Sequence, residues 1–184
     1  MIYRKIEECI GGICRFVIPI KHEYYLGNGR RIAICTLSSI NLLREISNDT
    51  KLMNKIAIVG RLLSENRGID NIIKYCITNQ ELVHLIVCGE DGNGNKAGHS
   101  LMTLFEKGIS KECKIIMSKS PYPNLISSYD DVQAIRVRIT IHNLIEETNL
   151  NIIDALFRWT GLIVRFFPFL VYFVLFRIIF YNIV

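Results

Sequence analysis

Four short, nearly continuous apolar runs constrain the fold of this chain more than any other feature. Each is rich in Ile, Val or Leu, and they lie at residues 31–37, 55–59, 82–88 and 113–117. Strands that are buried on both faces have this composition, and parallel sheets supply such strands. Helical patterns separate the later runs at residues 68–79 and 98–107. The alternation predicts an α/β fold with a Rossmann-like, mostly parallel sheet and flanking helices.

The C-terminal part of the chain differs in composition from the rest. Residues 166–184 are almost entirely apolar, and the segment is long enough for the ~20 residues that cross a bilayer. Arginines precede it, which favours a cytoplasmic location for the preceding domain. Pro168 and Arg177 count against an uninterrupted transmembrane helix. The alternative is that the segment forms a buried core helix. We expect a cytoplasmic domain over residues 1–155 and one C-terminal transmembrane helix, over residues 156–184, in the cell membrane.

Composition narrows the kinds of partner and ligand. The net charge is +5, but no basic run with interleaved aromatic residues stands out, so we expect membrane lipid as a partner and no nucleic acid. The six cysteines form no CxxC pair, and their spacing indicates neither a zinc site nor a disulfide framework. No paired carboxylate or Ser/His/Asp set has an assignable geometry, so no catalytic residue is predicted.

Polar residues follow each of the predicted strands. Because ligands of parallel α/β sheets bind outside the carboxyl ends of the strands, these residues form the candidate cofactor-binding set. The set comprises Thr36, Ser38, Ser64, Glu65, Asn66, Gly68, Gly89, Gly94, Asn95, Gly98, His99, Ser120 and Pro121. We expect the loops at residues 64–68 and 89–98 to line one cleft.

The loop at residues 89–98 holds four glycines in ten positions and leads into a predicted helix. Glycine lets a ligand approach the backbone, and a helix N-terminus attracts an anion, so a phosphate-bearing cofactor is one interpretation. The alternative is a loop that only turns the chain, because the glycines match neither GxGxxG nor a Walker A motif. A nicotinamide-dependent dehydrogenase is disfavoured because no acidic ribose-binding residue can be placed.

Several segments resemble one known family. Residues 60–70 read Gly-Arg-Leu-Leu-Ser-Glu-Asn-Arg-Gly-Ile-Asp, similar to a pattern of glycine, Ser-Glu-Asn and Gly-Ile-Glu in that family. Residues 79–108 continue the likeness with Leu-Ile-Val-Cys-Gly, a polar loop and a closing Glu-Lys-Gly. Residues 24–39 and 132–145 resemble its opening and its Arg-containing helix with an Ile-rich strand. The family is the corrinoid-carrying A subunit of tetrahydromethanopterin S-methyltransferase.

The resemblance implies a function, a cofactor and partners. In this family, the chain is one of the subunits of a membrane methyltransferase complex of methanogenic archaea. It carries a corrinoid-bound methyl group between methyl-tetrahydromethanopterin and coenzyme M, and other subunits couple the transfer to sodium transport. The family's single C-terminal membrane helix agrees with the apolar tail. We therefore expect a cobalamin-type corrinoid as cofactor and other subunits of such a complex as partners.

The chain departs from the family at the cobalt ligand. The family's Gly-His-x-x-Gly-Gln motif supplies the histidine below cobalt and falls here on residues 94–99, Gly-Asn-Lys-Ala-Gly-His. Asn95 takes the ligand position, and an amide is a poor donor to cobalt. Three interpretations stay open. Corrinoid binds without a protein ligand at cobalt, or His99 reaches cobalt after a loop shift, or corrinoid binding is lost. In the last case the chain is a membrane-anchored paralogue that acts as a binding or assembly module.

The remaining candidate residues have simpler interpretations. His84 lies within an apolar strand and is expected to be a core residue, whereas His22 and His142 are isolated. Glu65 is expected to orient the Ser-Glu-Asn loop or to contact an amide of a ligand.

Overall fold

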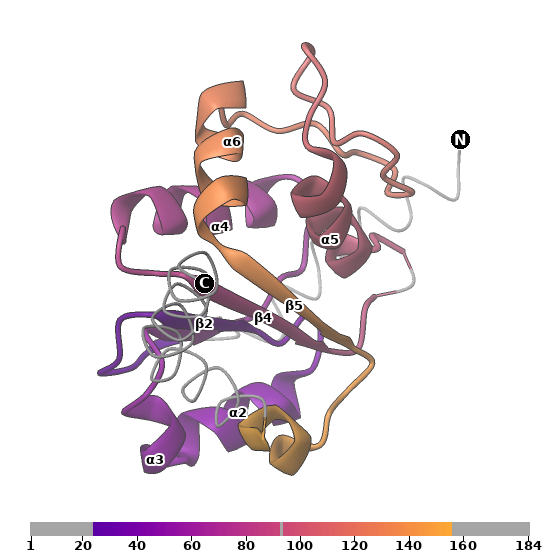
Figure 1. The fold of residues 1–184 in the computed structure, drawn as a ribbon. Helices are drawn as coiled ribbons and strands as arrows, with labels where there is room; N and C mark the ends of the chain where they lie inside the picture. The colour runs from indigo at the N-terminus through magenta and orange to yellow at the C-terminus, as the bar shows by residue number, and fades with distance from the viewer. Residues whose placement is uncertain (1–23, 93, 156–184) are drawn as a thin grey trace, which may run out of the picture.

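A computed structural model describes residues 24–92 and 94–155 of the chain (Figure 1). Residues 150–155 are helical. The other elements are, in chain order, β1 (Tyr24–Leu26), β2 (Ile32–Cys35), α2 (Ile40–Asn48), α3 (Thr50–Met53), β3 (Ile58–Gly60), α4 (Arg67–Thr78), β4 (His84–Gly89), α5 (Ala97–Lys107), α6 (Tyr129–Arg138) and β5 (Thr140–Ile145).

The strands of this part of the chain form one mixed sheet in the order β1-β3-β2-β4-β5. Four of them run parallel, and register places Ala33 beside Leu85, and Leu85 beside Ile141. The edge strand β1 is antiparallel to β3. Since β3 lies on one side of β2 and β4 on the other, the switch point of the sheet falls between β2 and β4.

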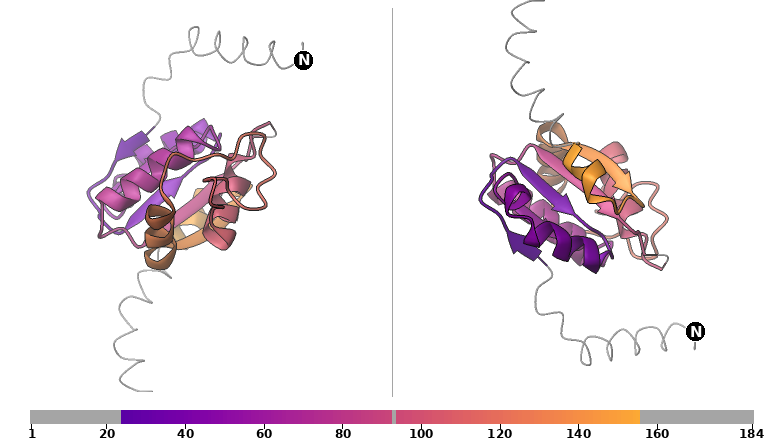
Figure 2. Two further views of the ribbon diagram at one scale, coloured as in Figure 1. Left: turned by 90° about the horizontal axis from the view of Figure 1, so that it is seen from above. Right: turned by 90° about the horizontal axis from the view of Figure 1, so that it is seen from below.

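Helices cover both faces of the sheet, which gives three layers. Figure 1 shows α4, α5 and α6 on one face and α2 with α3 on the other, and Figure 2 shows the two faces in turn. Side chains of one strand alternate between two cores. Ala33 and Cys35 join the core beneath α4 and α5, whereas Ile34 joins the core against α2. Burial on both faces explains why the central strands read as continuous apolar runs.

Capping residues fix the ends of the helices that carry the functional loops. The Asn66 side chain accepts a hydrogen bond from Arg67 N at the start of α4, and Asp70 lies in its first turn. The Ser128 side chain caps α6 in the same way, by accepting from Asp131 N. Oxygen acceptors at these positions satisfy N–H groups that the first helical turn leaves unpaired.

Three of the four predicted strands are confirmed, because the runs at residues 31–37, 55–59 and 82–88 overlap β2, β3 and β4. The predicted strand at residues 113–117 is wrong. It is an irregular loop in which Ile115 is buried but Met117 is 74% exposed with a positive φ of 60°. The next parallel strand is instead β5. A five-residue apolar run therefore does not reveal whether one face or two are buried.

The fold prediction needs a further correction, in its transmembrane helix. Within residues 24–92 and 94–155, no helix is both long enough and apolar enough to cross a membrane. The longest helix there, α4, has 12 residues and spans about 18 Å, against roughly 30 Å of bilayer hydrocarbon. The apolar segment on which the prediction rested, residues 156–184, lies outside the described residues. The boundary at residue 155 and the membrane location stay predictions.

Candidate functional site

The loops that follow β2 and β4 lie side by side at the switch point of the sheet. Ser38 N and Oγ both donate to Glu90 O, at 3.1 and 2.6 Å, and Glu90 N donates to Ser39 Oγ at 2.9 Å. These bonds join the two loops across the crevice in which sheets of this kind bind dinucleotides.

Unusual backbone conformations are concentrated at the same edge. Leu37, Lys96 and Glu146 are three of the five non-glycine residues with positive φ in the described part of the chain. Such residues cost about 1–3 kcal/mol each and cluster at functional sites. Gly89, with φ at 81°, ends β4, and a Cβ there would lie 2.5 Å from Thr36 O. The loop after β4 can therefore leave the sheet only from a glycine.

A carboxylate of the chain itself occupies the N-terminus of α5. Asp91 Oδ1 accepts from Gly98 N and Asp91 Oδ2 accepts from His99 N, each at 2.9 Å. A carboxylate is favourable here because the first helical N–H groups are unpaired and the helix dipole is positive at this end. One interpretation placed a phosphate of a cofactor at this position, and the structure fills it with Asp91.

Hydrogen bonds tie the glycine-rich loop to two other loops. Asn95 Nδ2 donates to Leu63 O at 2.9 Å, which connects it to the loop between β3 and α4. Ser120 Oγ lies 2.6 Å from Asn95 O and 3.1 Å from Lys96 O, and it also contacts Ser100 Oγ. Ser120 therefore reaches the predicted site, although the strand expected to precede it does not form.

His99 faces a cavity of about 460 Å³ beside α5 and the end of β5. Its Nδ1 lies 3.4 Å from Thr103 Oγ1, one turn along the helix. Three carboxylates, of Asp91, Glu106 and Glu146, also line this cavity. We refer to it as the α5 cavity.

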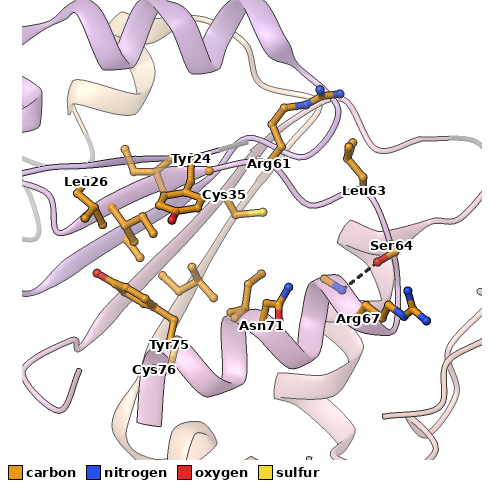
Figure 3. A pocket seen from close by; sticks show the side chains of 17 residues that line it. Tyr24, Leu26, Cys35, Arg61, Leu63, Ser64, Arg67, Asn71, Tyr75 and Cys76 are labelled. Carbon is orange, nitrogen blue, oxygen red and sulfur yellow. Dashed lines mark hydrogen bonds between the residues drawn. The ribbon is translucent and has the colours of Figure 1, made fainter. Parts of the chain in front are cut away.

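Ser64 and Gly68 line a different and larger cavity, of about 840 Å³, between α4 and the β1–β3 side of the sheet (Figure 3). We refer to it as the α4 cavity. The loops at residues 64–68 and 89–98 thus lie at the same end of the sheet, as expected, and are joined by the Asn95–Leu63 hydrogen bond. The expected single cleft is wrong, because the residues of the two loops line separate cavities.

The remaining predicted residues have structural contacts. Thr36 is fully buried and its Oγ1 lies 3.4 Å from Gly60 O. Glu65 is 3% exposed and its Oε1 accepts from Tyr122 N at 3.1 Å, so it joins the Ser-Glu-Asn loop to the segment at residue 122. Asn66 caps α4, and Pro121 is exposed.

Two cysteines of this region are unsuited to thiolate chemistry. Burial raises the pKa of the Cys35 and Cys76 thiols, which line the α4 cavity, to about 12. Both therefore stay protonated and weakly reactive at neutral pH. No group of three or more His, Cys, Asp or Glu side chains in residues 24–92 and 94–155 is arranged to hold a metal ion.

Comparison with protein families identifies the domain. The model of the family described as the A subunit of tetrahydromethanopterin S-methyltransferase matches residues 17–159. The chain belongs to this family. The resemblance predicted from residues 60–108 is therefore confirmed, and the matched region ends before the apolar segment that begins at residue 166.

Three curated relatives show how far the similarity extends. The A subunit of the putative methyltransferase Mtx from Methanosarcina barkeri is 31% identical over 142 residues, which are 76% of this chain and 67% of that protein. The tetrahydromethanopterin S-methyltransferase A subunit of Methanosphaera stadtmanae is 31% identical over 96 residues, 52% of this chain and 36% of that protein. Its counterpart of the same name from Methanosarcina acetivorans is 26% identical over 138 residues, 74% of this chain and 55% of that protein.

The side chain at position 95 is already hydrogen-bonded within the chain. The Asn95 amide nitrogen already donates to Leu63 O, and an amide nitrogen has no free lone pair to offer a metal. His99 is held at the start of α5 by the bond from its backbone N–H to Asp91. Its imidazole lines the α5 cavity from the first turn of that helix.

Proposed function

We propose that this chain is one of the subunits of a tetrahydromethanopterin S-methyltransferase complex. In it, the chain holds a corrinoid that carries a methyl group between methyl-tetrahydromethanopterin and coenzyme M. Family membership over residues 17–159 carries the proposal. The other subunits of the complex are the proposed partners, and they couple the transfer to sodium transport. The chain spans 36–67% of the length of the relatives compared above, so the substrates and partners of the whole complex belong to the proposal.

Open backbone in the glycine-rich loop supports the proposal of a large cofactor. A Cβ added to Gly92 or to Gly94 would meet no atom within 4 Å. Neither glycine is therefore required by packing within the described chain, and both present bare backbone to open space. Bare backbone lets a ligand approach closely, and this supports Gly92 and Gly94 as cofactor contacts.

When bound, a corrinoid supplies a cobalt ion that accepts and releases the methyl group. The residues of this chain fit a corrinoid held without nitrogen from position 95. The Asn95 amide stays hydrogen-bonded to Leu63 O, and its carbonyl oxygen can accept from amide groups on the rim of the cofactor. Asp91 and Ser120 hold the loop in shape from within.

Titration of the full-length protein with cobinamide tests this proposal. Cobinamide lacks the nucleotide base, so any nitrogen below cobalt must come from the protein. We expect micromolar binding to the wild type without the absorption spectrum of nitrogen-ligated cobalt. Asn95→His should bind more tightly and introduce that spectrum, because imidazole is a good cobalt donor.

His99→Ala separates the interpretations of the cobalt ligand. We expect it to leave the spectrum of the wild-type complex unchanged, because His99 is held in α5. A spectral change in His99→Ala would instead identify His99 as a ligand. If neither the wild type nor Asn95→His binds cobinamide at micromolar concentration, the corrinoid proposal is wrong.

A second candidate function is an assembly module without corrinoid. The internal bonds of the glycine-rich loop favour it, since Asp91 occupies the α5 N-terminus and Asn95 is bonded to Leu63 O. Under this alternative, the tagged chain should co-purify with other methyltransferase subunits from its own cells but should not bind cobinamide. Recovery of a corrinoid with the purified chain would exclude it.

A further inference from the structure

The α4 cavity exists because one face of α4 has no partner on the sheet among the described residues. Ile69, Ile73 and Cys76 form the stripe of α4 that enters the core. A neighbouring stripe, which includes Asn71 and Tyr75, lines the cavity, and Tyr75 also packs against the core. Opposite it, the sheet presents small residues (Ala33, Cys35 and Gly60) that leave the space open.

The two ends of the α4 cavity differ in chemistry. Tyr24 and Leu26 of β1 and Tyr75 of α4 lie at one end, and Tyr24 and Leu26 are 58% and 65% exposed (Figure 3). Arg61 and Arg67 lie at the other end, near the loop between β3 and α4 (Figure 3). The cavity is therefore aromatic and apolar at one end and cationic at the other.

Charge complementarity indicates what the cavity binds. None of the described residues that line it is Asp or Glu, so the two guanidinium groups give the lining a net positive charge. The Arg61 guanidinium donates to Ser38 O at 3.1 Å and points away from α4 in Figure 3, so the exposed Arg67 is the cation that a ligand can engage. Guanidinium groups bind carboxylate and phosphate with paired hydrogen bonds, and tyrosine rings stack on flat apolar rings.

We propose that the α4 cavity binds a small molecule that combines a flat apolar ring with an acidic group. The acidic group lies toward Arg67, and the ring lies toward Tyr24 and Tyr75. The volume of about 840 Å³ is within the range of roughly 300–1,000 Å³ found for small-molecule sites. Ser64 and Gly68 of the candidate cofactor-binding set also line this cavity, whereas the α5 cavity and the glycines at 92 and 94 are separate from it.

Isothermal titration of the full-length protein with 1-naphthyl phosphate tests the proposal. This probe has the ring and the acid, 1-naphthol has only the ring, and inorganic phosphate has only the acid. We expect 1-naphthyl phosphate to bind in the micromolar range and each control ligand at least about tenfold more weakly, a loss of ~1.4 kcal/mol. Failure of 1-naphthyl phosphate to bind below millimolar concentration would overturn the proposal.

Variants of α4 assign the binding to this cavity. Arg67→Gln should weaken 1-naphthyl phosphate about tenfold and leave 1-naphthol unchanged, because only the charge contact is lost. Asn71→Trp should abolish binding of both by filling the cavity. Lys74→Gln is the matched control, since Lys74 is an exposed cation of the same helix outside the lining, and it should change neither ligand.

Two results would contradict the assignment. Equal affinities of the wild type, Arg67→Gln and Asn71→Trp would place the binding elsewhere on the molecule. Self-association of the wild type that Asn71→Trp abolishes, without 1-naphthyl phosphate binding, would identify the cavity as a contact between copies of the chain. Both Arg67 and Asn71 are exposed, so these substitutions should leave cooperative thermal unfolding intact.

Discussion

At the scale of single residues, the glycines after β4 have different physical reasons to be glycine. Gly89 has φ at 81°, and a Cβ would lie 2.5 Å from Thr36 O and 2.8 Å from Ser39 Oγ. Gly89→Ala should therefore lower the free energy of unfolding by about 2–3 kcal/mol, measured by chemical denaturation. Gly92→Ala, which meets open space, should change it by less than about 0.5 kcal/mol.

The same pair of substitutions separates stability from binding. If corrinoid lies against bare backbone, Gly92→Ala should weaken cobinamide binding while the free energy of unfolding stays that of the wild type. Equal losses of stability in Gly89→Ala and Gly92→Ala would show that the loop is packed against the chain, contrary to the structure.

His84 and His142 form a pair that is sensitive to pH. His142 Nε2 lies 3.2 Å from His84 Nδ1 across β4 and β5, and both side chains are half-buried. Burial lowers the pKa of His84 below its ordinary value of 6.5, and the charges of His142 and Arg31 lower it further. Burial also lowers the pKa of His142. Below pH 6.5 the unfolded chain therefore binds more protons than the folded one.

This difference predicts the direction of the pH effect. The contribution of the pair to stability is fully present above pH 6.5 and decreases as the pH falls below that value toward the lowered folded-state pKa values. Urea denaturation of the wild type across this range should show the decrease. His142→Asn should show a shallower decrease, because one imidazole and one cause of the His84 shift are gone. Parallel profiles of wild type and variant would contradict the assignment to this pair.

At the scale of elements, two arginines of α6 cap the carboxyl ends of α4 and α5. Arg138 donates to Asn79 O at 3.1 Å and to Cys76 O, at the end of α4. Arg136 donates to Phe105 O at 2.9 Å and to Glu106 O at 3.0 Å, at the end of α5. The last carbonyls of a helix are otherwise unpaired, and a cation suits the negative end of the helix dipole.

Removal of one of these cations should destabilise the packing of α4, α5 and α6, the helices beside which both cavities lie. Arg138→Met should lower the free energy of unfolding by about 2 kcal/mol, because it leaves several carbonyls without a charged donor. Arg44→Met, at an exposed position of α2, is the control and should change it by less than about 0.5 kcal/mol. Chemical denaturation followed by circular dichroism measures both. Equal effects of the two substitutions would contradict a capping role for Arg138.

At the scale of the whole molecule, the sheet divides the described chain into two cores and directs the functional loops to one end. α4, α5 and α6 share the larger core, and α2, α3 and Ile153 share the other. The α4 and α5 cavities both lie beside helices of the first layer. The Asn95–Leu63 hydrogen bond connects the loops that line them.

Local pattern in the sequence was sufficient for most of the α/β architecture. Runs buried on both faces predicted β2, β3 and β4, and helical spacing predicted α4 and α5. The stretch from residue 60 to residue 108 also indicated the family. These features depend on neighbours within a few residues, and such neighbours are visible in the chain itself.

Only the tertiary structure decided which residues meet. The strand predicted at residues 113–117 failed because its burial depends on elements far away in the chain. The hydrogen bonds of Asp91 at α5, Asn95 to Leu63 O, and the contact of His84 with His142 join residues 7 to 58 positions apart. The α4 cavity depends on which side of the sheet β1 joins and on how far α4 reaches across it. Packing between elements sets these outcomes, and no local pattern encodes them.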